Sequence, residues 1–257
     1  MTQEERRIRL VTALLEERGE KAEPGDIGDE KAQKELLRAL FNTRPPWPVS
    51  SEFLEIQDAF LQEERNVRGV TSAESIPFMR GRLCLWQGDI TLLDCDAIVN
   101  AANSAMLGCF HPGHHCIDNA IHTFAGVQLR LVCARMMEEQ GHPERTGGAK
   151  ITPAFNLPSR HVIHTVGPIV NGEPSAEDAR LLASCYASCL DLAAKNNVET
   201  LAFCCISTGV FGFPQKEAAT IAVQTVTDRL KDYPAIRKVI FNVFRNSDLE
   251  IYRRLLG

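Results

Sequence analysis

One short stretch of the chain, GCFHPGHHCIDNAIH over residues 108–122, holds two cysteines, four histidines and one aspartate. Thiolate and imidazole are the donors that zinc prefers in proteins. A site with three protein ligands keeps a fourth position open for water or substrate, whereas a structural site is closed by four. The stretch therefore predicts a zinc ion with an open position, and with it an enzyme.

Local geometry favours two of the donors as partners. His114 and Cys116 are two residues apart, so in an extended backbone they project to the same side while His115 projects away. Cys109 reaches them if the chain turns back at residues 112–113, a Pro-Gly pair that makes such a turn feasible. These three residues are the favoured ligand set.

Two other histidines of the stretch have alternative interpretations. His111 is a plausible substitute ligand. His122 lies four residues after Asp118 on an expected helix, where a buried, hydrogen-bonded histidine is a sufficient explanation. Asp118 itself could cap that helix.

The other cysteines call for no chemistry. The chain has nine, an odd number that suits a reducing compartment better than a disulfide framework. Seven lie outside the 108–122 stretch, and we expect them to be buried, inert thiols. They are Cys84, Cys95, Cys133, Cys185, Cys189, Cys204 and Cys205.

The first 75 residues are expected to form a helical extension. Apolar residues follow helical spacing over 4–20 and 29–42, and three prolines in NTRPPWPVS then interrupt the pattern. A serine cap opens a further helix within residues 50–64. The remaining residues, 76–257, form the second expected unit.

Strands and helices alternate in residues 76–257. The expected strands are 82–90, 96–103, 161–170, 200–207 and 238–244, and the expected helices are 183–197, 216–233 and 247–256. Such alternation predicts an α/β sheet with helices on both faces. Ligands of these sheets bind beyond the strand ends.

Three strand-end segments have polar or glycine-rich sequences. Asp89 in GDIT could accept a hydrogen bond from an exocyclic amine or cap a turn. Asn100 and Asn103 in NAAN could orient hydroxyls or bond their own backbone. Residues 207–214, STGVFGFP, could offer backbone N–H groups to an anion, but they match neither the Rossmann fingerprint nor the P-loop.

Charge and hydropathy exclude other classes of function. A net charge of -5 argues against general affinity for nucleic acid. No long apolar run is present, so we expect neither a signal sequence nor a membrane span, and we expect a cytoplasmic protein.

The order and spacing of GDIT, NAAN, CIDNAIHTFAG, TGGAKIT, HVIHTVGP and STGVFGFP resemble the macrodomain family over roughly residues 80–257. The resemblance implies a three-layer α/β/α macrodomain with a mixed central sheet that binds ADP-ribose. Some members of the family hydrolyse the bond between ADP-ribose and protein.

The loop after NAAN, which is commonly glycine-rich in the family, is here AMLGCFHPGHHC. It is similar to that of a zinc-dependent subgroup in bacteria and fungi, which removes mono-ADP-ribose from proteins. The subgroup's zinc ligands fall on Cys109, His114 and Cys116. A helical N-terminal extension is also common there, and some bacterial relatives resemble partners of a sirtuin-type transferase that acts on a lipoyl-carrier protein.

The resemblance also implies roles for individual residues. Asp89 and Ile90 would recognise adenine, with Phe244 as an aromatic face for the ring. Asn103 would orient the distal ribose, and Asp118 would act as a proton acceptor. The other implied substrate-binding residues are Asn100, Ser207, Thr208, Gly209, Val210 and Phe211.

Two alternatives to a hydrolase remain open. The first is a reader that binds ADP-ribose while the metal only shapes the loop. In the second, residues 1–75 dock a partner and the α/β part serves as their scaffold.

Overall fold

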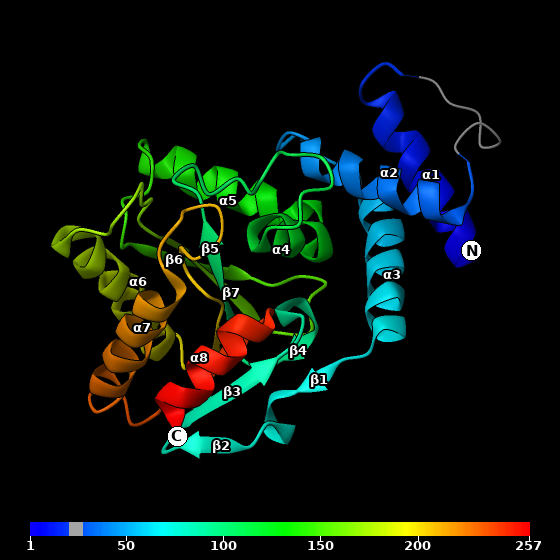
Figure 1. The fold of residues 1–257 in the computed structure, drawn as a ribbon. Coiled ribbons are helices and arrows are strands. Elements are labelled where there is room, and N and C mark those ends of the chain that lie inside the picture. Colours follow the sequence, from blue (N-terminus) through cyan, green and yellow to red (C-terminus); the bar gives the residue numbers. More distant parts are fainter. Residues whose placement is uncertain (21–27) are drawn as a thin grey trace.

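The computed structural model describes residues 1–20 and 28–257. Three N-terminal helices come first: α1 (Gln3–Glu16), α2 (Glu30–Thr43) and α3 (Ser51–Arg68) (Figure 1). Thr2, Asp29 and Ser50 cap them with side-chain oxygens, which supplies acceptors for otherwise unpaired N–H groups. The expected N-terminal helices are confirmed over the described residues, and the last of them ends at Arg68, before residue 75.

The N-terminal helices have a small apolar core of their own. Leu10, Leu14, Leu37 and Phe60 are buried in it, and Val127 joins it from the second part of the chain. The helices therefore pack on the α/β part and do not stand apart from it.

A mixed seven-stranded sheet forms the centre of the second part, in the order β2-β3-β9-β8-β5-β7-β6. The inner strands run parallel, while β2 and β6 are antiparallel to their neighbours at the two edges. The strands are β2 (Phe78–Arg80), β3 (Leu83–Gln87), β5 (Ala97–Ala102), β6 (Ala149–Pro153), β7 (His161–Val166), β8 (Thr200–Phe203) and β9 (Lys238–Val243). A separate short parallel pair joins β1 (Thr71–Ser72) to β4 (Leu93–Asp94).

Helices cover both faces of the sheet, which makes the three layers expected from the sequence (Figure 1). One face carries α4 (Ile117–Ala125) and α5 (Val127–Gln140), and the other carries α6 (Ala176–Lys195), α7 (Gln215–Arg229) and α8 (Asn246–Leu256). Because the inner strands are parallel, their carboxyl ends meet at one edge of the sheet, where ligands bind in such folds.

The structure contains elements that the sequence patterns did not predict. Helix α5 was not predicted, and its buried face is small and interrupted by Arg130. Helix α6 begins at Ala176, earlier than the expected residue 183, because Ser175 and Asp178 form a capping box. Among the described residues, no helix is both long and apolar enough to cross a membrane.

Candidate active site

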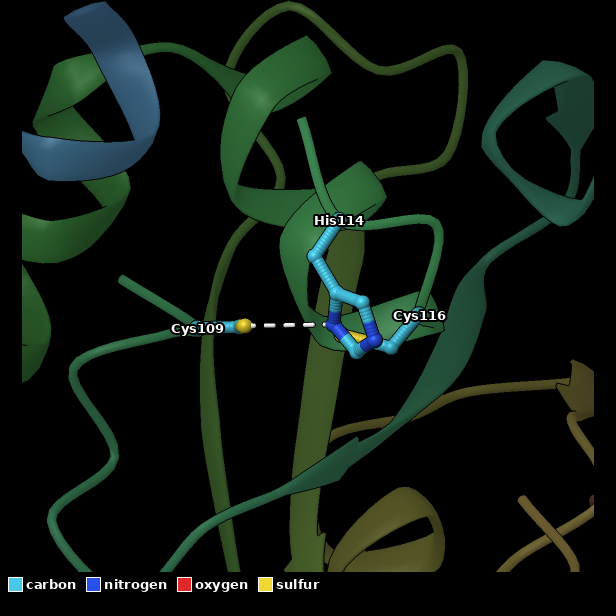
Figure 2. A group of neighbouring side chains, drawn as sticks. All are labelled: Cys109, His114 and Cys116. Carbon is cyan, nitrogen blue, oxygen red and sulfur yellow. Dashed lines mark hydrogen bonds between the residues drawn. The ribbon is translucent and has the colours of Figure 1, made fainter. Parts of the chain in front are cut away.

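Cys109, His114 and Cys116 meet in the loop between β5 and α4. Their donor atoms all lie within 4.8 Å of one another, and the three residues are half-buried. The Sγ atom of Cys109 lies 3.4 Å from Nδ1 of His114, and Figure 2 shows the three side chains pointing toward a common centre. The predicted ligand set is therefore brought together.

Local backbone geometry positions these donors. Gly113 has a φ of 63°, which favours glycine, and the His114 N–H closes the turn on the carbonyl of His111 at 3.2 Å. Cys116 is the N-cap residue of α4, and its sulfur accepts a hydrogen bond from the Asn119 N–H at 3.4 Å. The partial positive charge at a helix N-terminus stabilises a thiolate at this position.

The donor set fits a zinc ion. Burial raises the pKa of the Cys116 thiol to about 11, while the hydrogen bond from Asn119 acts in the opposite direction. A divalent cation among the donors would replace the thiol protons and balance the thiolate charge in this half-buried position. Two sulfurs and one imidazole nitrogen are also the ligand types that zinc prefers.

The remaining histidines of the stretch lie outside this donor set. The His111 ring packs edge-on against His114 with centroids 6.0 Å apart. His122 is buried as expected, but among the described residues neither ring nitrogen has a hydrogen-bond partner, so the hydrogen-bonded part of that expectation is wrong. Its Nε2 lies 3.6 Å from Asp118, too far for a hydrogen bond.

A second group of metal-type donors comprises His122, Cys133 and His164, all buried. Both nitrogens of His164 already have partners, Asn100 at 3.1 Å and Thr152 at 3.0 Å. This group therefore belongs to the polar part of the core behind the site.

Asp118 is a buried carboxylate at the start of α4. Asn100 donates to its Oδ1 at 2.8 Å, and Asn103 lies 3.3 Å from its Oδ2. Burial raises the pKa of Asp118 to about 6, while the Asn100 hydrogen bond and the charge of Arg130 lower it. Because Cys116 caps α4, the alternative role of Asp118 as the helix cap is wrong.

The residues expected at the adenine end lie at the carboxyl ends of β3 and β9. Asp89 accepts hydrogen bonds from the Thr91 N–H at 2.9 Å and its hydroxyl at 2.6 Å, and it pairs with Arg68 of α3. Ile90 is buried next to it, and Phe244 is 77% exposed, so its ring is free to stack. Asp89 thus also caps a short 3-10 helix, as its alternative interpretation predicted.

The glycine-rich loop after β8 has free backbone donors. Among the described residues, the N–H groups of Gly209, Val210 and Phe211 have no hydrogen-bond partner. Ser207 adopts a φ of 65°, and its buried hydroxyl also has no partner there. Such donors suit a phosphate.

Arginines from other elements reach the site, and the sequence patterns did not reveal them. Arg38 of α2 donates a hydrogen bond to the carbonyl of His114. Arg68 of α3 stacks over Phe124, with 4.1 Å between its guanidinium carbon and the ring centroid. Arg130 of α5 bonds the carbonyl of Leu107 at 2.7 Å. No local motif marks these residues, because their roles depend on contacts between distant segments.

Known proteins are similar to this chain in sequence. The Macro domain family matches residues 99–222. The chain is 54% identical to a protein-ADP-ribose hydrolase of Treponema medium over the full length of both chains, and 52% identical to one of Staphylococcus aureus, with 85% of this chain and 83% of that protein covered.

Solved structures of macrodomains share the fold. An Oceanobacillus iheyensis macrodomain mutant with ADPR is 38% identical to this chain and has a TM-score of 0.64. The match covers 70% of this chain and 95% of the mutant's chain. The Trypanosoma brucei macrodomain in complex with ADP-ribose is 29% identical to this chain and has a TM-score of 0.67. The match covers 86% of this chain and 95% of the Trypanosoma brucei chain.

Proposed function

This chain belongs to the macro domain family, and from that membership we propose that it removes mono-ADP-ribose from modified protein side chains by zinc-dependent hydrolysis. The observation that carries the proposal is the convergence of Cys109, His114 and Cys116 directly before the helix that holds Asp118. Relatives named as protein-ADP-ribose hydrolases support the reaction class.

The nucleotide would lie along the edge where the parallel strands end. Asp89 and the backbone of Ile90 bind adenine, and the exposed ring of Phe244 stacks on it. The diphosphate accepts hydrogen bonds from the backbone of Ser207, Gly209, Val210 and Phe211. The Thr208 N–H bonds the Cys205 carbonyl at 3.4 Å and completes the loop. Few charged side chains are then needed to hold the diphosphate.

Hydrolysis breaks the bond between C1 of the distal ribose and the protein side chain. The hydroxyl of water goes to C1, and the proton goes to the released side chain. A zinc ion held by Cys109, His114 and Cys116 would supply a Lewis acid that orients a ribose hydroxyl or water. Asn103 orients the ribose, and Asp118 accepts the proton of the attacking water and passes it to the released side chain.

The buried position of Asp118 supports this role. Asn100 and Asn103 hold both carboxylate oxygens, so the side chain has one orientation.

As the protein that carries the ADP-ribose, we propose a lipoyl-carrier protein modified by a sirtuin-type transferase.

The test is release of free ADP-ribose from a mono-ADP-ribosylated protein, with and without a zinc chelator. We expect release that stops with the chelator and returns on addition of zinc, while calorimetry shows that free ADP-ribose still binds. Binding without release under any metal condition would contradict the proposal and favour a reader. Cys109→Ala, which removes one of the three donors, should also stay inactive. Its matched control is Cys84→Ala, because Cys84 is a buried cysteine on β3 outside the site.

A further inference from the structure

The N-terminal helix α2 lies against the loop that carries the metal-type donors. Arg38 of α2 donates from Nη2 to the backbone carbonyl of His114 at 3.2 Å and to Oδ1 of Asn119 at 3.1 Å. His114 is itself one of the three donors. A residue of the helical extension thus fixes the backbone of a donor residue.

A second residue of α2 bonds the adjacent position. The side-chain oxygen of Asn42 accepts from the Gly113 N–H at 3.0 Å, and its amide donates to the hydroxyl of Thr123 at 2.7 Å. Asn42 is only 1% exposed, so little water can replace it as the partner of Gly113. The turn before His114 is therefore held from α2 as well.

Asn119 extends these contacts to the other end of the loop. It is fully buried, and its amide lies 3.1 Å from the carbonyl of His111 and 3.4 Å from that of Cys109. Because Arg38 bonds the same side chain, the backbones of Cys109, His111 and His114 belong to one hydrogen-bond network that includes α2.

The other contacts of the helical extension keep α2 in place. Arg130 of α5 donates to the carbonyl of Phe41 at 3.0 Å and to that of Leu107, which precedes the loop, at 2.7 Å. Gln57 of α3 accepts from the Val127 N–H at 2.9 Å. The helices are thus bonded to the α/β part on both sides of the loop.

We propose that Arg38 and Asn42 are positioning residues for the metal-binding loop, so that the N-terminal helices form part of the hydrolase site. The proposal rests on the metal site of the proposed function. Holding the loop backbone in its donor geometry before the ion binds lowers the ordering cost of binding. Groups that orient metal ligands typically change metal affinity by roughly 10–100-fold.

The first experiment measures zinc affinity of the full chain by competition with a chromophoric chelator. We expect Arg38→Ala to weaken zinc binding by roughly 10–100-fold, and Arg38→Lys, which keeps a charge and a donor, to fall between Arg38→Ala and the wild type. Lys31→Ala, an exposed position on the same helix, is the matched control and should bind like the wild type. Equal affinity of Arg38→Ala and the wild type would overturn the proposal.

A second readout needs no metal. Hydrogen exchange of residues 105–116 in the metal-free chain should be faster in Arg38→Ala and in Asn42→Ala than in the wild type. Exchange in β5 and β7 reports whether each variant remains folded. If Asn42→Ala does not fold, loop exchange in Arg38→Ala alone decides the test. Unchanged exchange in the loop of folded Arg38→Ala would overturn the proposal.

The two readouts separate the two claims. A wild-type chain that binds no zinc contradicts the metal site of the proposed function, and loop exchange then decides the role of α2 by itself. A wild-type chain that binds zinc as tightly as Arg38→Ala contradicts only the role of α2.

Discussion

The side-chain amide of Asn100, at the buried centre of β5, donates a hydrogen bond to Oδ1 of Asp118 at the start of α4, with 2.8 Å between the two atoms. The same amide lies 3.1 Å from Nδ1 of His164 on the neighbouring strand β7. The carboxylate is therefore attached to the sheet, and α4 carries both this carboxylate and Cys116 at its N-cap. One helix start thus links the proposed metal site to the proposed proton acceptor.

Replacing the carboxylate tests its role in the chemical step. We expect Asp118→Asn to lower the rate of ADP-ribose release by roughly 10²–10⁴-fold, because proton transfer to a positioned base contributes about that much. ADP-ribose affinity, measured by calorimetry, should change little. Asp94→Asn, an exposed carboxylate on β4, is the control. A release rate within a factor of two of the wild type would remove Asp118 from the mechanism.

The adenine end makes a separate prediction about binding. Phe244→Ala should weaken ADP-ribose binding by roughly 1–3 kcal/mol, the value typical of base stacking on an aromatic ring. The matched control is Phe78→Ala, since Phe78 is also exposed but lies on the edge strand β2. Equal losses in the two variants would show that the Phe244 ring has no specific role.

Position 108, directly before the donor residue Cys109, needs a glycine for two reasons. Gly108 has a φ of 81°, and a Cβ atom there would lie 2.7 Å from Cγ of the buried His122 ring. We expect Gly108→Ala to lower the free energy of unfolding by about 1–3 kcal/mol. Gly81→Ala, with a φ of 58° and open space, should cost less. Urea denaturation compares the two, and equal losses would contradict the steric part of this account.

Buried histidines predict the dependence of stability on pH. Burial lowers the pKa of His164 to about 4 and that of His122 well below its ordinary value. The unfolded chain therefore binds more protons at these sites as the pH falls below about 6.5, and stability should fall with it. Asp118 acts oppositely, because its pKa is raised to about 6 and the folded state takes up its proton first.

His164 alone accounts for roughly 2 kcal/mol of lost stability between pH 7 and pH 5. Arg130 keeps its charge and Cys133 its proton over this range, so two histidines oppose one carboxylate and the net change is destabilising. Urea denaturation at both pH values should show a smaller drop for His164→Gln than for the wild type. An equal drop would mean that His164 is not the titrating group.

The sequence predicted the fold well where local patterns carry the information. The strands that hold Asn100 and His164, and the strand that ends just before Phe244, lie near their predicted positions, because apolar runs of strand length mark them. Helix α5 was missed because its buried face is short and interrupted by Arg130, and β6 because its residues are mostly half-buried.

The metal-type donors could be predicted because they lie close together in the sequence. Arg38 and Arg68 could not, because each reaches the site from a distant helix and contacts it only after the chain has folded. The partners of Asp118 were visible as residue types in NAAN, but their hydrogen bonds depend on the placement of α4 against β5.

The most direct test of the account is zinc titration of the metal-free wild-type chain, following ADP-ribose release from a mono-ADP-ribosylated protein. We predict that release begins near zero, rises with added zinc and saturates at one equivalent per chain. Cys109→Ala and Cys116→Ala should stay inactive throughout. Full activity of the metal-free wild-type chain would contradict the account.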